Sequence, residues 1–309
     1  METLELSRSV AFKNILLATD FSEASAKTIP YAAAIASRYG SKVYLVHVIP
    51  PEPKLGIPLE PLPPELDRDR SDSALAMKTL ASADPLKEIP HEVLLEEGPI
   101  RDVLSELIRR NEIDLLVLGT HGRGGLKKVI LGSVAEELFR QAPCPVLTIG
   151  PAVPVAPAGA TELRRILFAT DFGAASLHAL PYAVSLATES EARLILLHVL
   201  APMPVVDVGP YWYPGTDLVQ QQEKARVKGI EQLRKLIPPE ADLPTDPEFF
   251  VALDFVPDGI LRIAAGCQAD LIVMGVNRAA SARASAHLPW AIAHEVVCHA
   301  KCPVLTVRG

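Results

Sequence analysis

Glycine and serine residues with a distinctive spacing follow an apolar run in the first half of the chain. Gly119-Thr-His-Gly122 comes directly after residues 115–118, and nine residues later Gly132-Ser133 stands where a new helix is expected to begin. Glycines let main-chain N–H groups approach an anion closely, and a helix N-terminus adds unpaired N–H groups and a favourable dipole. The Ser133 hydroxyl can donate a further hydrogen bond. This pattern predicts a phosphate-binding loop.

An aspartate follows an earlier apolar run, at the carboxyl end of a predicted strand. Asp20 comes shortly after residues 15–18, and in an open parallel sheet it faces the same crevice as the glycine loop. Its carboxylate could accept hydrogen bonds from a nucleoside or help to hold a cation, for which Mg²⁺ is the candidate beside phosphates. His121 lies inside the loop without a visible nucleophile or orienting partner, so no catalytic residue is predicted.

The same pattern of residues occurs twice along the chain. Residues 15–48 and 166–199 align without a gap at an offset of 151, and about 15 of the 34 positions are identical. Two later matches have nearly the same spacing, namely DLLVLG at 114–119 with DLIVMG at 270–275, and CPVLT at 144–148 with CPVLT at 302–306. Similarity over a whole strand–helix–strand unit indicates tandem copies of one domain.

Each copy alternates apolar runs with helical patterns. In the first copy, runs typical of buried parallel strands lie at 15–18, 43–48, 91–95, 115–118 and 145–149. Helices are predicted from a Ser22 cap to Gly40 and at 65–83, 99–110 and 134–141, with a Pro-rich loop at 50–64. Strands that alternate with helices indicate the α/β class, here two tandem doubly wound, Rossmann-like parallel-sheet domains.

The composition fits two ordinary globular domains. The chain has 309 residues, of which 49% are hydrophobic, and we place domains at 1–150 and 163–309, joined by a Pro- and Ala-rich linker at 151–162. A net charge of −7 argues against a broad nucleic-acid surface. We find no secretory signal and no apolar run of about 18 residues, so no membrane span is expected. Four sparse cysteines indicate reduced thiols in a cytoplasm.

Three segments, ATDFS at 18–22, LVHV at 45–48 and GTHG-x9-GS at 119–133, resemble the ATP-binding branch of the universal stress protein family. The resemblance covers both copies. It implies that the glycine motif holds the phosphates and ribose of ATP, while the first-strand Asp and the backbone after the second-strand His line the adenine side. The site residues so implied are Asp20, Val48, Gly119, Gly122, Gly132, Ser133 and Val134. Family members often dimerise, so the two copies are expected to pack together, and a further homodimer is left open.

The second copy departs from this motif. Asp171, Val199 and Gly275 remain, but Arg278 stands where the second glycine belongs, and no glycine aligns with Gly132. Leu288-Pro289 or Trp290-Ala291 falls there instead, depending on the alignment. Bulky side chains obstruct close backbone approach and Pro lacks an N–H. We therefore predict no triphosphate in the second copy, while another ligand is left open.

His294, Cys298 and Cys302 of the second copy are candidate metal ligands, because the first two share a helical face and all three are soft donors. Zinc sites usually have tighter ligand pairs, and buried thiols behave as small hydrophobes. We predict no metal there. His47 and His198, which end matching strands, are interpreted as structural.

The sequence thus predicts a cytoplasmic stress-response protein that holds ATP in domain 1 as a sensor or regulatory module. Two alternatives remain open at this stage. One is a slow ATPase or nucleotidyl transferase that uses the same pocket, and the other is an interaction scaffold that works without nucleotide.

Overall fold

The computed structural model describes residues 10–51, 65–120, 138, 142–155, 161–202, 217–237, 241–277 and 288–309. Contacts divide the chain into two units. The first unit contains Ala11–Glu162, which includes the first repeat, together with Val297–Arg308 from the end of the second repeat. The second unit contains Leu163–Val296. The last strand of the second repeat therefore belongs to the unit of the first repeat.

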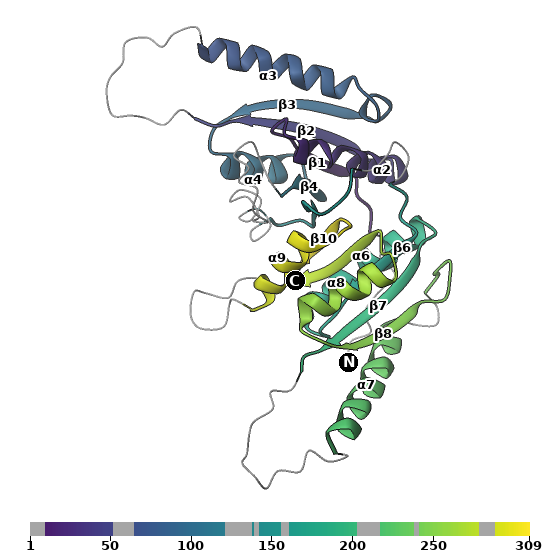
Figure 1. Ribbon diagram of the computed structural model, residues 1–309. Coiled ribbons are helices and arrows are strands. Elements are labelled where there is room, and N and C mark those ends of the chain that lie inside the picture. The colour runs from purple at the N-terminus through teal and green to yellow at the C-terminus, as the bar shows by residue number, and fades with distance from the viewer. Residues whose placement is uncertain are drawn as a thin grey trace, which may run out of the picture. The chain divides into compact units, whose positions relative to one another are not determined.

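The first unit contains a largely parallel sheet with the strand order β3-β2-β1-β4-β5-β10. Figure 1 labels β3, β2, β1 and β4 of this sheet. β10 pairs antiparallel with β5, with Leu305 opposite Leu147. The other neighbouring strands of this unit pair in parallel. In chain order the elements are β1 (Asn14–Ala18), α1 (Glu23–Ala26), α2 (Ile29–Tyr39), β2 (Lys42–Ile49), α3 (Glu65–Ala81), the 3₁₀ helix η1 (Leu86–Glu88), β3 (His91–Glu97), α4 (Ile100–Arg110), β4 (Leu115–Gly119), β5 (Val146–Ile149) and β10 (Val304–Arg308).

The second unit repeats this arrangement with the strand order β9-β6-β7-β8, all parallel. Its elements are β6 (Arg165–Ala169), α6 (Ala174–Glu189), β7 (Arg193–Leu200), α7 (Asp217–Leu236), β8 (Glu248–Leu253), α8 (Val256–Gly266), β9 (Leu271–Val276) and α9 (Leu288–His299). The last three residues of α9 are assigned to the first unit, and the helix leads into β10. The order corresponds strand for strand to β4-β1-β2-β3 of the first repeat. The predicted duplication and the doubly wound α/β class are confirmed.

The core of each unit is the apolar run of its central strand. Ile15, Leu16 and Leu17 of β1 have no exposed surface, and Ile166 and Leu167 of β6 are equally buried. Helices cover both faces of a parallel sheet, so such strands carry consecutive apolar residues rather than alternating ones. Burying each large apolar side chain stabilises the fold by about 1.5–3 kcal/mol.

The helix predicted from Ser22 to Gly40 is wrong in one respect, because it is divided. α1 ends at Ala26 and α2 begins at Ile29, while Gly40 ends α2 with a φ of 62° as expected of a C-cap. Pro30 cannot donate to the Ala26 carbonyl, and the Thr28 hydroxyl donates to the Ser25 carbonyl at 2.6 Å. In the second repeat an alanine replaces Thr28, and α6 is continuous although it contains a proline.

The other described elements match the predicted ones to within a few residues at their ends. The helices expected at 65–83 and 99–110 are α3 and α4, and the five predicted strands of the first copy are β1 to β5. The helix expected at 134–141 lies outside the described residues, apart from Leu138, which is helical. Within the described ranges, no helix combines the length and hydropathy that a membrane crossing requires.

Candidate functional site

The carboxyl ends of β1 and β4 meet where the strand order reverses. Strand order runs from β1 to β2 and β3 on one side and to β4 and β5 on the other, and ligands of open α/β sheets bind at such a switch point. Asp20 follows β1, and Gly119 ends β4. A Cβ built on Gly119 would lie 2.8 Å from the carbonyl oxygen of Ala24 in α1. The structure therefore brings the helix that follows the Asp20 turn close to Gly119.

The chain leaves β1 through a tight corner. The Thr19 N–H donates to the Val46 carbonyl at 2.9 Å, and the Thr19 hydroxyl accepts from the Phe21 N–H at 3.1 Å. Phe21 has a φ of 63°, a left-handed conformation that is uncommon outside glycine. The centroid of its ring lies 4.4 Å from that of the His47 ring. The His47 Nδ1 is 2.8 Å from the Thr19 carbonyl oxygen. These contacts fix the path of the backbone that follows β1.

The Asp20 carboxylate is held within this corner. Its Oδ1 accepts hydrogen bonds from the main-chain N–H of Ser22 at 3.0 Å and from the Ser22 hydroxyl at 2.6 Å. Ser22 is also the N-cap of α1, where its hydroxyl oxygen accepts from the Ser25 N–H at 3.2 Å. Asp20 is half-buried, so the corner presents an oriented carboxylate after the carboxyl end of β1.

The second repeat builds the same corner. The Thr170 hydroxyl accepts from the Phe172 N–H at 2.9 Å, and Phe172 has a φ of 62°. The centroid of the Phe172 ring lies 4.5 Å from that of the His198 ring. The His198 Nδ1 is 2.8 Å from the Thr170 carbonyl oxygen. The corner is therefore a property of the fold, and His47 and His198 both contact backbone and an aromatic ring, in keeping with a structural role.

Gly119 has a packing reason that the sequence analysis missed. In the second repeat a Cβ on the equivalent Gly275 would lie 2.2 Å from the Ala175 carbonyl oxygen. Both repeats thus need glycine here because a helix backbone comes too close for any side chain. The signal was present in the sequence, since Gly275 persists in the copy that lacks the rest of the loop. Gly119 alone is therefore no sign of phosphate binding.

Of the other predicted site residues, Val48 is buried near the end of β2, opposite Glu96 of β3. Gly122, Gly132, Ser133 and Val134 lie outside the described residues, as do His121 and Arg278. Of the seven predicted site residues, the structure therefore describes Asp20, Val48 and Gly119.

The cysteines do not form a site in the part of the chain that the structure describes. None of the four forms a disulfide, and Cys144, Cys298 and Cys302 are buried. Burial raises the pKa of the Cys144 thiol to about 12. Among the described residues, no three His, Cys, Asp or Glu side chains gather as metal ligands would. The candidate set of His294, Cys298 and Cys302 therefore gains no support.

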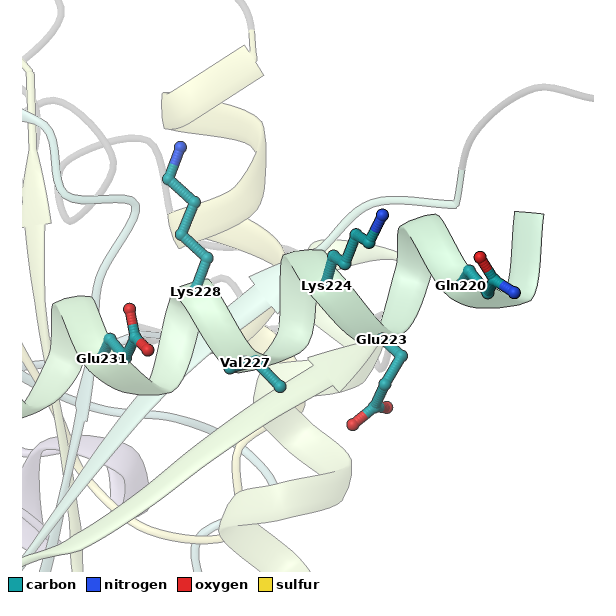
Figure 2. A pocket seen from close by; sticks show the side chains of 6 residues that line it. All are labelled: Gln220, Glu223, Lys224, Val227, Lys228 and Glu231. Atoms are coloured by element: carbon teal, nitrogen blue, oxygen red, sulfur yellow. The ribbon is translucent and has the colours of Figure 1, made fainter. Parts of the chain in front are cut away.

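A shallow surface groove follows α7 in the second unit. Figure 2 shows its lining side chains, which extend from this one helix in more than one direction: Gln220, Glu223, Lys224, Val227, Lys228 and Glu231. Glu223 pairs with Arg226 at 2.7 Å, and that ion pair lowers the pKa of the Glu223 carboxyl. Because every lining residue belongs to a single exposed helix, the groove has no second wall to enclose a ligand.

Comparisons with known proteins agree with this architecture. The model of the universal stress protein family matches residues 11–150 and again residues 162–308. A universal stress protein of Methanocaldococcus jannaschii is 34% identical over 142 residues, which are 45% of this chain and 82% of the relative. One of Thermus aquaticus is 36% identical over 143 residues, 45% of this chain and 98% of the relative.

A solved structure extends the similarity to the whole chain. The crystal structure of a universal stress protein from Archaeoglobus fulgidus covers 96% of this chain and 97% of its own, with 20% identity and a TM-score of 0.64. At this identity the likeness concerns the fold, and it spans both repeats.

Proposed function

The chain belongs to the universal stress protein family, and we propose that it is a stress-response protein that binds ATP in its first repeat as a sensor or regulatory module. The contrast between the repeats carries this proposal. The second repeat builds the same corner and the same close glycine contact without the remaining loop glycines. The fold therefore does not require Gly122, Gly132 and Ser133, and their spacing in the first repeat is typical of a phosphate loop.

In this proposal, different residues bind different parts of the nucleotide. Main-chain N–H groups near Gly122, Gly132 and Val134, with the Ser133 hydroxyl, hold the phosphates. A carboxylate repels phosphate, so Asp20 serves the nucleoside, whose hydroxyl and amino groups are donors, or a Mg²⁺ ion beside the phosphates. Val48, which is buried at the end of β2, contributes an apolar wall of the kind that adenine needs.

A cytoplasmic location is part of the proposal. None of the thiols of Cys144, Cys267, Cys298 and Cys302 forms a disulfide. Unpaired cysteines are usual where glutathione and thioredoxin keep thiols reduced.

Calorimetry with ATP tests the binding function. We expect the wild-type chain to take up one ATP, and Gly132→Trp to abolish uptake because the indole fills the space that the phosphates need. Arg278→Ala, which alters the corresponding loop of the second repeat, is the matched control and should leave uptake unchanged. Absence of ATP binding to the wild-type protein, or two ATP molecules per chain, contradicts the proposal.

The same preparation separates binding from hydrolysis. With ATP saturating the site and Mg²⁺ present, a binding module releases ADP at the uncatalysed rate. ADP release well above that rate, lost in Gly132→Trp, would identify an ATPase instead.

A further inference from the structure

The two repeats hold the equivalent aspartate in different ways. Asp20 Oδ1 accepts from the N–H and the hydroxyl of Ser22, at 3.0 and 2.6 Å. In the second repeat Gly173 replaces Ser22, and Asp171 Oδ1 accepts from the Gly173 N–H at 2.8 Å and from the Ser176 hydroxyl at 2.7 Å. The hydroxyl that holds the carboxylate has thus moved from the N-cap to a residue inside the helix.

The helical serine makes two contacts that are the same in both repeats. The Ser176 hydroxyl lies 2.9 Å from that of Thr170 and 3.0 Å from the Gly173 carbonyl oxygen. Ser25, the equivalent of Ser176, has its hydroxyl 3.1 Å from that of Thr19, and it donates to the Ser22 carbonyl at 3.0 Å. The hydroxyls of Ser22 and Ser25 are 3.4 Å apart. The third contact differs, because the Ser25 hydroxyl faces the Ser22 hydroxyl that holds Asp20, whereas the Ser176 hydroxyl contacts Asp171 directly.

The backbone geometry of the second repeat shows that a side chain at position 173 would crowd the carboxylate. A Cβ built on Gly173 would lie 3.0 and 3.2 Å from the two carboxylate oxygens of Asp171, closer than the ordinary contact distance of about 3.5 Å. The carboxylate of Asp171 thus uses space that a serine side chain would take. Asp171 is also exposed, whereas Asp20 is half-buried. The residue two positions after the aspartate and the surroundings of the carboxylate thus differ together between the repeats.

We propose that Ser22 is a positioning residue that fixes the Asp20 carboxylate for the nucleoside or cation of the bound nucleotide. This inference rests on the proposed ATP site of the first repeat. A charge-assisted hydrogen bond from the hydroxyl holds the carboxylate in one orientation before the ligand arrives, which lowers the entropic cost of binding. Gly173 gives the second repeat a different carboxylate position, in the copy that also lacks the phosphate loop.

Crystal structures of nucleotide-free variants test the positioning step directly. In Ser22→Gly we expect the Ser25 hydroxyl to donate to Asp20, as Ser176 does to Asp171. In the reciprocal Gly173→Ser variant we expect the new hydroxyl to hold Asp171 and to displace Ser176. An Asp20 carboxylate that keeps its position in Ser22→Gly without a new donor would overturn the proposal.

A double-mutant cycle measures the effect on binding. By calorimetry with ATP, Ser22→Gly should bind about tenfold more weakly, the loss expected for one charge-assisted hydrogen bond. Ser22→Thr should restore most of the affinity, because its hydroxyl can still donate. In an Asp20→Asn background Ser22→Gly should cause no further loss. If the double variant loses ATP affinity by the product of the two single factors, Ser22 does not act through Asp20. Full affinity in Ser22→Gly would show the same.

The cycle also separates positioning from helix capping. Loss of the Ser22 cap lowers stability in both backgrounds, so thermal unfolding without nucleotide reports it separately. A capping effect on ATP affinity would persist in Asp20→Asn, whereas a positioning effect disappears there. If the wild-type chain takes up no ATP, the proposed function fails, and the nucleotide-free structures alone decide whether Ser22 positions Asp20.

Discussion

The glycine that ends β4 and its counterpart in β9 form a matched pair for substitution. An alanine Cβ would lie 2.8 Å from a helix carbonyl oxygen at position 119 and 2.2 Å from one at position 275. Backbone atoms cannot relieve such a contact by changing rotamer as a side chain can. We expect each variant to lose about 1–3 kcal/mol of unfolding free energy, with the larger loss at Gly275. Only Gly119→Ala should also weaken ATP binding. Denaturant titration and calorimetry measure the two effects.

The control for this pair is Gly266, which ends α8 and has nothing within 4 Å of an added Cβ. Gly266→Ala should leave stability unchanged or raise it by up to about 1 kcal/mol, because alanine favours helix. Wild-type stability in Gly119→Ala would refute the packing role assigned to the β4 glycine.

The buried thiol of Cys144 should make stability fall at high pH. Burial raises the pKa of this thiol from its ordinary value near 9.0 to about 12. Between these values the unfolded chain releases a proton that the folded chain retains, so the unfolded state binds fewer protons and the free energy of unfolding decreases as pH rises. In Cys144→Ala the decrease between about pH 9 and 11 should be shallower. Denaturant titrations across this range test the slope, and equal slopes would contradict the assignment.

Local sequence predicts some of these residue properties and not others. Asp20 at a strand end and Ser22 as a cap follow from neighbouring residues alone, and both are found as predicted. The bond between them was not foreseen, because it depends on the left-handed backbone at Phe21. The packing of Gly119 against Ala24 joins segments far apart in the chain, so only comparison of the repeats could have indicated it.

At the level of elements, the apolar strands were predictable because burial on both faces demands consecutive large hydrophobic residues. The division between α1 and α2 was not, since the apolar spacing is nearly the same in both repeats. One hydroxyl distinguishes them: Thr28 donates to the Ser25 carbonyl, whereas the equivalent Ala179 cannot. Such competition between a side chain and helical hydrogen bonding leaves no trace in hydrophobic periodicity.

The pairing of β10 with β5 gives a prediction at this scale. Leu305 is buried and lies opposite Leu147. Leu305→Ala should cost about 2–5 kcal/mol, and hydrogen exchange should accelerate in β5 although the substitution lies in the second repeat. Leu271→Ala, in β9 beside β6, is the matched control and should accelerate exchange in β6. Unchanged exchange in β5 of Leu305→Ala would exclude the pairing.

For the whole molecule, the repeat boundary and the contact boundary differ. The sequence places 163–309 in one domain, because the repeat ends with the second CPVLT segment. The contacts assign Val297–Arg308 to the unit of the first repeat. Strand pairing of this kind depends on which edge is available in the folded state, and the identical CPVLT segments carry no information about it. The proposed ATP site therefore belongs to a unit that is completed by the end of the second repeat.

This arrangement predicts how ATP should stabilise the chain. A ligand that binds only the folded state, at 100 times its Kd, adds about 2.7 kcal/mol to the stability of the unit that holds it. Hydrogen exchange should therefore slow in β1, β4 and β5, and also in β10, because β10 pairs with β5. β6, β7 and β8 of the second unit should change less. Gly132→Trp, which cannot take up ATP, should show none of these changes. Slower exchange in β6 to β8 without any change in β10 would place the nucleotide in the second unit, since protection follows the strands that share a cooperative unit with the ligand.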